Sequence, residues 1–278
     1  MIGGRIQARF AELSRKNRAG FVAYVMAGDP DAETALAILQ GLPSAGADLI
    51  ELGMPFSDPM ADGPPVQRAA LRALASGMTM DGVFDLARRF RLTDTTTPVV
   101  LMGYLNPILS QGYETFAARA AAAGIDGLIA VDCPPEEADP LADALDRAGV
   151  DLIRLATPTT DEARLAIVAR RTRGFVYYVS VAGVTGAKAA VAHDVAPAVA
   201  RVREASGLPV AVGFGIRTPE QAAAIARVAD AAVVGSALVD SIAAAVAEGE
   251  DPAARLLATA AALGEAISSA RVLVEEPR

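Results

Sequence analysis

Short apolar segments recur along the whole chain and alternate with segments of helical character. Most are apolar at nearly every position, which is typical of strands buried on both faces of a parallel sheet. Thr159 with Glu162, and Thr218 with Gln221, have the spacing of capping boxes that begin helices. Strict alternation of the two kinds of segment predicts consecutive βα units. The apolar segments are residues 21–26, 49–52, 99–102, 127–131, 152–155, 175–179, 210–212 and 231–234.

A weak internal repeat supports this division of the chain. The sequence AGADLI at 45–50 resembles AGVDLI at 148–153, and residues 123–129 and 228–233 are looser copies. A glycine that ends a helix in the left-handed conformation lets the next strand begin at once. The repeat therefore predicts helix-to-strand turns at the same point of several βα units.

Eight such units predict a closed (β/α)8 barrel, the TIM barrel, as one domain over residues 1–278. An extra N-terminal helix is expected at about 5–14 and an additional C-terminal helix at about 251–271. The alternative is an open, doubly wound sheet. It would need a G-x-G-x-x-G turn after the first strand, and residues 26–30 (MAGDP) do not provide one.

The charge balance restricts the classes of partner. With a net charge of −8 and a pI of about 4.8, the chain repels nucleic-acid backbones and anionic membranes. The single cysteine, Cys133, cannot form an intramolecular disulfide. No signal peptide and no apolar run of the roughly 18 residues needed for a membrane span are seen. We expect a cytoplasmic protein that binds neither nucleic acid nor membrane. Any anionic ligand must then be held by a local binding site, against the overall negative charge.

Glycines at the ends of the last two predicted strands could form that anion-binding site. Residues 213–216 (GFGI) follow the seventh strand, and residues 235–237 (GSA) open a helix after the eighth. Glycine lets backbone N–H groups approach a phosphate, and a helix N-terminus adds partial positive charge. Barrel enzymes commonly bind phosphate at this place. The turns could equally be tight connections without a ligand, although their joint position favours phosphate.

Glu51 is the candidate catalytic group from the residues alone. Ile50 and Leu52 share one face of the second strand, so Glu51 takes the other. If the apolar pair packs on the helices, the carboxyl group points into the barrel mouth, where burial raises its pKa and suits it to acid–base catalysis. The alternative is an ion pair with an arginine of a neighbouring strand, such as Arg154. Asp62, taken alone, fits a turn or a helix cap better.

Scarce residue types narrow the chemistry further. The only lysines are Lys16 and Lys188, neither of them predicted on a strand, which disfavours a Schiff-base aldolase. One histidine, His193, and one cysteine cannot build a conventional zinc or iron site. A carboxylate-rich Mg²⁺ site is less firmly excluded. What remains is carboxylate acid–base catalysis on a phosphate ester. Cleavage of a C–C bond would then need a substrate that takes up the electrons itself.

Several motifs together resemble the tryptophan synthase alpha chain family, in its order and spacing, over roughly residues 21–236. The most specific is the run from Glu51 to Pro64. The others are residues 28–30 (GDP), 102–107 (MGYLNP), 183–186 (GVTG) and 213–216 (GFGI). The resemblance implies a (β/α)8 barrel that cleaves indole-3-glycerol phosphate to indole and glyceraldehyde 3-phosphate. Protonated indole can accept the electrons of the breaking bond, which agrees with the need stated above for a substrate that takes up the electrons itself.

The resemblance also implies roles for individual residues. Glu51 would be the acid–base group, Asp62 would bind the indole N–H and stabilise the developing positive charge, and Tyr177 would position Glu51 or the substrate. The remaining implied residues bind the substrate: Gly186, Gly215, Gly235 and Ser236 hold the phosphate, Tyr24, Met102 and Leu155 contact the indole, and Thr185 closes a lid, residues 180–188, onto Asp62. The lid segment could equally be a simple connection.

The family works as an αββα heterotetramer, in which pyridoxal phosphate belongs to the beta chain. The resemblance therefore implies a beta-chain partner, no cofactor on this chain, and a partner-facing loop around Pro55 and Asp58. Three other hypotheses stay open. They are a non-catalytic activator of a beta chain, a stand-alone relative that releases free indole, and another phosphosugar enzyme such as an isomerase.

Overall fold

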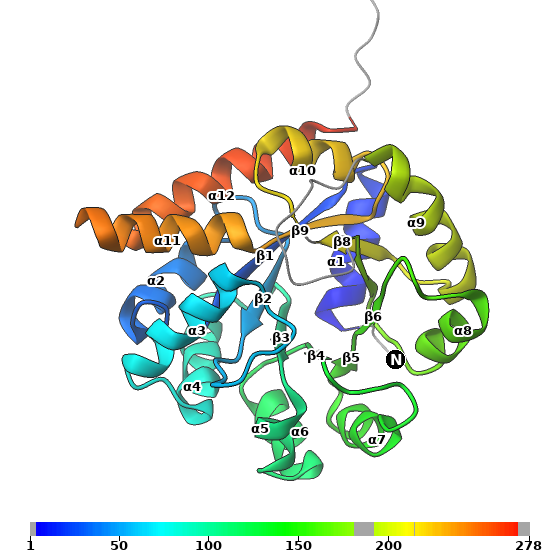
Figure 1. The fold of residues 1–278 in the computed structure, drawn as a ribbon, viewed down its shortest axis with the longest axis horizontal. Helices are drawn as coiled ribbons and strands as arrows, with labels where there is room; N and C mark the ends of the chain where they lie inside the picture. The colour runs from blue at the N-terminus through cyan, green and yellow to red at the C-terminus, as the bar shows by residue number, and fades with distance from the viewer. Residues whose placement is uncertain (1–3, 181–191, 214, 272–278) are drawn as a thin grey trace, which may run out of the picture.

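Parallel strands joined by helices make up the part of the chain that the computed structural model describes, residues 4–180, 192–213 and 215–271 (Figure 1). The strands are β1 (Gly20–Met26), β2 (Leu49–Gly53), β3 (Val99–Gly103), β4 (Gly127–Ala130), β5 (Asp151–Leu152), β6 (Arg154–Ala156), β7 (Val176–Val179), β8 (Val210–Gly213) and β9 (Ala231–Val234). The helices are α1 (Arg5–Arg15), α2 (Ala32–Gly41), α3 (Pro64–Ala75), α4 (Met80–Arg91), α5 (Leu105–Leu109), α6 (Tyr113–Ala122), α7 (Asp139–Ala148), α8 (Glu162–Arg170), α9 (Ala192–Ser206), α10 (Pro219–Ala226), α11 (Ser236–Glu248) and α12 (Pro252–Ser269).

The sheet closes on itself. Its strand order is β5-β4-β3-β2-β1-β9-β8-β7-β6, with parallel pairing throughout. The two end strands, β5 and β6, are one stretch of chain separated only by Ile153, whose backbone N–H donates to the Leu128 carbonyl at 2.9 Å. The predicted fifth strand is thus split in two, because its first part pairs with β4 and its second with β7. The predicted TIM barrel, with additional helices α1 and α12, is confirmed.

Alternation along the strands separates two apolar layers. Ile50 and Leu52 belong to the larger cluster, which the surrounding helices cover. Leu49 and Val100 belong to a second cluster inside the barrel, together with Phe10 of α1. Because residues two apart on a strand share a face, Glu51 lies on the interior face with Leu49. Helix α1 closes the barrel at the end where the strands begin.

The aspartates of the internal repeat are structural. Three of the four, Asp48, Asp126 and Asp230, stand directly before a strand, and each carboxylate accepts a hydrogen bond from a backbone N–H of the neighbouring strand, whereas the fourth, Asp151, is the first residue of β5. The donor lies at 2.8 or 2.9 Å in each pair: Phe21 for Asp48, Val99 for Asp126 and Val210 for Asp230. The repeat therefore links adjacent strands at the closed end of the barrel.

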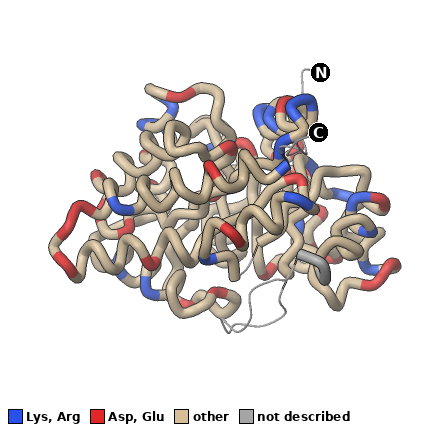
Figure 2. Tube along the Cα trace, turned by 90° about the horizontal axis from the view of Figure 1, so that it is seen from above, with Lys and Arg blue, Asp and Glu red and all other residues tan. Residues whose placement is uncertain are grey.

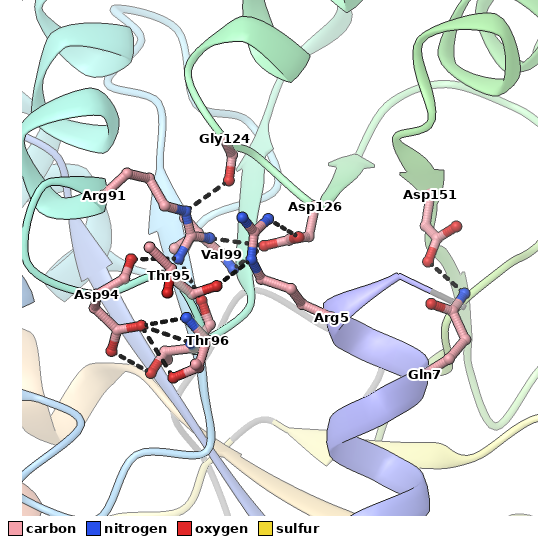
Figure 3. Close-up of polar contacts among 11 residues, drawn as sticks. Arg5, Gln7, Arg91, Asp94, Thr95, Thr96, Val99, Gly124, Asp126 and Asp151 are labelled. Carbon is pink, nitrogen blue, oxygen red and sulfur yellow. Dashed lines mark hydrogen bonds and ion pairs between the residues drawn. The ribbon is translucent and has the colours of Figure 1, made fainter. Parts of the chain in front are cut away.

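Arginines compensate these buried carboxylates and fasten α1 across the barrel. Asp126 lies between Arg5 of α1 and Arg91 of α4, each at 2.8 Å (Figure 3). On the other side of α1, the Gln7 side chain donates to Asp151 at 2.8 Å (Figure 3). Charge-assisted hydrogen bonds of this kind compensate a buried carboxylate for its lost contacts with water.

The two predicted capping boxes have different outcomes. Thr218 caps α10 as predicted, with Gln221 completing the box and a proline in the first turn. The prediction for Thr159 was wrong, because α8 begins at Glu162 and its N-cap is Asp161, which accepts from the Arg164 N–H at 2.8 Å. A carboxylate is a strong N-cap that the helix dipole also favours, so the helix begins two residues later.

In the described ranges, no helix combines the length and apolar character needed to cross a membrane.

Candidate active site

Polar side chains gather inside the barrel at the end where the strands finish. Tyr24 of β1 and Glu51 of β2 lie side by side in the sheet register. Tyr177 of β7 comes from the far side of the ring, and Asp62 from the loop between β2 and α3. Burial raises the pKa of Glu51, Tyr24 and Tyr177, and the charge of Asp62 raises each of them further, so these groups share one electrostatic environment.

Glu51 is an isolated carboxyl group in the interior. Its side chain is only 1% exposed, and its Oε2 atom has no hydrogen-bond partner among the described residues. Burial, reinforced by the charge of Asp62, raises the pKa of Glu51 to about 8. The group therefore carries a proton at neutral pH.

The alternative ion pair between Glu51 and Arg154 does not form, because Ile153 and Leu155 face the barrel interior and Arg154, between them, faces away from Glu51. Arg154 lies on β6, whereas the neighbours of β2 are β1 and β3. Arg154 is itself buried, and its Nε has no partner in the described part of the chain. Desolvation by burial lowers the pKa of Arg154. The environment of Glu51 is therefore set by burial and by another carboxylate, and an arginine does not neutralise it.

Asp62 is less buried than Glu51 and is held by hydrogen bonds. Its side chain accepts a hydrogen bond from the Tyr104 hydroxyl, and its carbonyl accepts one from the Gln67 amide at 2.9 Å. Burial raises the pKa of Asp62 to about 6, against the effect of the Tyr104 hydrogen bond, which lowers it. At pH 7 the site thus combines a protonated Glu51 with an ionised Asp62, a division that suits acid–base chemistry.

Tyr104 belongs to the site, although no role was predicted for it from the sequence. Its hydroxyl oxygen accepts from the Ala61 N–H at 2.9 Å, and its ring packs on Phe56 with 5.3 Å between centroids. Tyr104 therefore fastens the loop that carries Asp62 to the end of β3. The sequence feature that could have identified Tyr104 as a site residue is its position directly after a predicted strand, within the motif at 102–107.

Two glycines give the interior tyrosines room. A Cβ atom on Gly53 would lie 2.4 Å from the Tyr24 hydroxyl, and one on Gly213 would lie 2.2 Å from that of Tyr177. The other edge of the Tyr24 ring lies against Gly235, where a Cβ atom would be 3.3 Å from Cδ1. The Tyr24 ring therefore spans the space between the end of β2 and the turn after β9.

The candidate phosphate-binding turns follow β8 and β9, and the second of them lies against the Tyr24 ring. Gly235 is the N-cap of α11, and no side chain caps that helix, which leaves its first N–H groups open to a ligand. Gly215 adopts a φ of 80°, which favours glycine. Ser236 is the first residue of α11, while Thr185 and Gly186 lie outside the described residues.

The predicted indole-contacting residues lie on the interior face. Met102 and Leu155 are half-buried and pack against the interior cluster, while Tyr24 is 5% exposed. Leu155 stands beside Tyr177 in the sheet register. At the barrel mouth, Asp58 is exposed and Met60 is 76% exposed, so the loop after β2 presents both a charge and an apolar side chain to the surface.

Known proteins with sequences similar to this chain are described as tryptophan synthase alpha chains. Residues 10–268 match the family model described as tryptophan synthase alpha chain. The tryptophan synthase alpha chain of Phenylobacterium zucineum (strain HLK1) is 70% identical over 271 residues, 98% of either chain. That of Caulobacter vibrioides (strain NA1000 / CB15N) is 68% identical over 272 residues, 98% of this chain and 99% of the relative.

A solved structure agrees with this likeness. Tryptophan synthase subunit alpha from Legionella pneumophila str. Paris superposes with a TM-score of 0.89 at 42% identity, over 95% of this chain and 98% of that one. The matched region contains every strand of the barrel and both carboxyl groups, Glu51 and Asp62. The chain belongs to the tryptophan synthase alpha chain family.

Proposed function

We propose that this chain cleaves indole-3-glycerol phosphate to indole and glyceraldehyde 3-phosphate, with Glu51 as the acid–base group. The observation that carries the proposal is the state of Glu51, a buried carboxyl group that is protonated at neutral pH beside an ionised Asp62. A group with a pKa near the working pH can both give and take a proton within one turnover.

The reaction needs two proton movements at neighbouring atoms. Glu51 first gives its proton to C3 of the indole ring, which converts the ring to an indolenine with a positively charged nitrogen. The resulting carboxylate then removes the proton of the adjacent glycerol hydroxyl. As the C–C bond breaks, its electrons pass into the ring and neutralise the nitrogen, while the hydroxyl carbon becomes the aldehyde. Glu51 ends the cycle protonated, as it began.

Asp62 would stabilise the charge that develops in the first of these steps. Its ionised carboxylate accepts a hydrogen bond from the indole N–H, and this interaction strengthens as the nitrogen becomes positive. Tyr104 supports the role by its hydrogen bond to the same carboxylate. Tyr177 would position Glu51 or the substrate from across the barrel.

The rest of the substrate would be held by backbone and apolar contacts. The turns at Gly215 and Gly235, with the first N–H groups of α11, suit the phosphate group because the helix dipole attracts negative charge. We infer that the remaining predicted residues complete the site: Gly186 and Ser236 at the phosphate, Tyr24, Met102 and Leu155 around the indole, and Thr185 closing onto Asp62.

We further infer that residues 1–278 form one domain that works with a beta chain in the cytoplasm. Pairing of β1 with β9 and packing of α12 on α2 join the two ends of the chain, which supports a single unit. The expected assembly is the αββα heterotetramer, with pyridoxal phosphate bound by the beta chain alone. The exposed loop around Asp58 is the surface we expect to face that partner.

An indole-release assay tests the proposal directly. Purified chain is incubated with indole-3-glycerol phosphate, alone and with a beta chain, and free indole is measured. Release that rises on addition of the beta chain supports a partnered lyase, whereas full activity of the isolated chain would indicate a stand-alone enzyme. Turnover of other phosphosugars but not of this substrate would favour an isomerase, and no turnover at all would favour a non-catalytic activator.

A further inference from the structure

A cavity lies at the opposite end of the barrel from the candidate active site. Its volume is about 380 Å³, within the range typical of small-molecule sites. The ends of α1 and α9, the residues directly before β8 and β9, and Arg271, two residues after α12, surround it. Strand β8 has four residues that each rise about 3.3 Å, so the cavity is on the order of 10 Å or more from the turn at Gly215.

Arginines dominate the polar part of this N-face pocket, as we call the cavity. Arg18, Arg203 and Arg271 line it, and Asp230 is its only acidic lining residue. Arg203 pairs with Asp230 at 3.0 Å. Arg18 pairs with Asp48, which lies behind the wall and also contacts Arg9 at 3.5 Å. Among the described residues, the guanidinium groups of Arg9, Arg18, Arg203 and Arg271 thus share two carboxylates, which leaves an excess of two positive charges at this place.

Arg271 is the cation that lacks a carboxylate partner in the described part of the chain. It is half-buried, and its guanidinium donates to the backbone carbonyls of Ala226 and Ala229. Desolvation by burial lowers the pKa of Arg271; the charge of Asp230 opposes this effect, and the positive charge of Arg203 adds to it. Binding of an anion would stabilise a guanidinium that lies near other cations in low-dielectric surroundings.

The neighbouring turn fixes a second cation of the pocket. Helix α1 ends in a Schellman motif, in which Asn17 adopts a φ of 47° and the Arg18 N–H donates to the Leu13 carbonyl at 3.0 Å. Arg18 is therefore held by backbone geometry and by its ion pair with Asp48. Because this cation is already ordered, a ligand would lose little binding free energy in fixing it.

The remaining wall is apolar. Phe10 and Leu13 of α1 face the pocket from one side, and Leu208 and Pro209, directly before β8, from the other. Such a wall suits a ligand with an apolar body next to its charged group. We propose that the N-face pocket binds a small phosphate monoester with an apolar or aromatic substituent, its dianion matching the excess of two positive charges.

The test uses phenyl phosphate as the probe and isothermal titration calorimetry as the measurement. The candidate active site could also bind the probe, so the chain carries Ser236→Asp, which places a carboxylate at the phosphate turn and is favourable at a helix N-terminus. We expect this chain to bind one phenyl phosphate. Benzoate, with the same ring and one charge, should bind at least about tenfold more weakly, the effect of one charge-assisted hydrogen bond.

Two pocket variants in the same background locate the binding site. Asn17→Asp adds a negative charge at an exposed position that tolerates a positive φ, and Arg271→Gln removes the uncompensated cation. Each should weaken phenyl phosphate binding at least about tenfold. The control Arg88→Gln, which changes an exposed arginine of α4, should leave it unchanged.

Three results would overturn the proposal. They are no binding by the Ser236→Asp chain, binding that neither pocket variant weakens, and benzoate binding as tight as that of phenyl phosphate. Asn17→Asp leaves the Arg271 hydrogen bonds intact, so the test does not depend on the folding of the arginine variant. Binding is measured without turnover, and Arg271→Gln in the otherwise natural chain should release indole at the normal rate. The lyase proposal can therefore fail independently.

Discussion

The hydroxyl group of Tyr24 lies directly over Gly53, only 2.4 Å from the point that a Cβ atom of this residue would occupy. The same ring touches Gly235 with its other edge. The two ends of the proposed substrate, the indole beside Glu51 and the phosphate at Gly235, are thus separated by the length of one buried tyrosine. Packing at Gly53 therefore controls how the acid and the phosphate turn are placed relative to each other.

Replacing Gly53 with alanine should lower indole release at least about tenfold, because the Tyr24 ring must move and a displacement of about 1 Å can cost far more than that. Steady-state kinetics measure the effect. The matched control is Gly103→Ala at the end of β3, where the added Cβ meets the flexible Met54 side chain. The double variant Gly53→Ala/Tyr24→Phe should recover part of the loss. Equal activity of both single variants would show that the Tyr24 contact does not matter.

The pH dependence of kcat/KM should show an alkaline limb near pH 8. Glu51 must be protonated to act on C3, and its pKa is raised to about 8. The acid limb, near pH 6, would combine Asp62 with the phosphate of the substrate, which titrates at about the same pH. The alkaline limb is therefore the informative one. A rate that stays constant up to pH 10 would argue against a protonated Glu51 in the free enzyme.

Removing the Tyr104 hydroxyl should move the acid limb. Its hydrogen bond lowers the pKa of Asp62, so Tyr104→Phe should raise that pKa and shift the limb to higher pH. We also expect kcat to fall about tenfold, since Asp62 loses a contact that orients it. Tyr113→Phe, at a half-buried tyrosine of α6, is the control. A lower kcat with an unmoved acid limb would mean that Tyr104 serves only the packing of the loop.

Burial of Glu51 should make the stability of the fold depend on pH. Its pKa is about 8 in the folded chain and near 4.5 when unfolded, so the folded state retains a proton that the unfolded state releases between these values. The wild-type chain therefore loses stability as pH rises from about 4.5 to 8. Relative to wild type, Glu51→Gln should become more stable over this window, by on the order of a few kcal/mol.

Denaturant unfolding of both chains at pH 5, 7 and 9 measures this difference in the free energy of unfolding. Glutamine has nearly the shape of the protonated acid, so the comparison isolates the titration of one group. A difference that is the same at all three pH values, or that favours the wild-type chain at high pH, would be inconsistent with a raised pKa of Glu51.

The barrel could be predicted from the sequence because its strands are nearly continuous apolar segments that glycine and proline residues bound. The interior position of Glu51 followed from alternation on β2 alone, since Ile50 and Leu52 belong to the outer layer. The split at Ile153 could not be predicted. It depends on which neighbour each half of the strand pairs with, and that is set by closure of the whole ring.

Long-range polar contacts were likewise beyond the sequence. The Tyr104 contact with the Asp62 loop joins residues about forty positions apart, and no local pattern encodes it. Asp29 shows the same limit. The motif at 28–30 was seen, but its buried bidentate pair with Arg72 of α3, at 2.7 Å for both contacts, was not. This pair fastens the loop after β1 to the helix that follows Asp62.

The most direct test of the account is the rate of indole release by Glu51→Gln, measured with a beta chain present and with circular dichroism to show that the fold persists. Glutamine keeps the shape of the buried side chain but cannot give or take the proton, so we expect the rate to fall by at least about a thousandfold, within the range of general acid–base catalysis. A variant that releases indole at nearly the normal rate would contradict the role of Glu51.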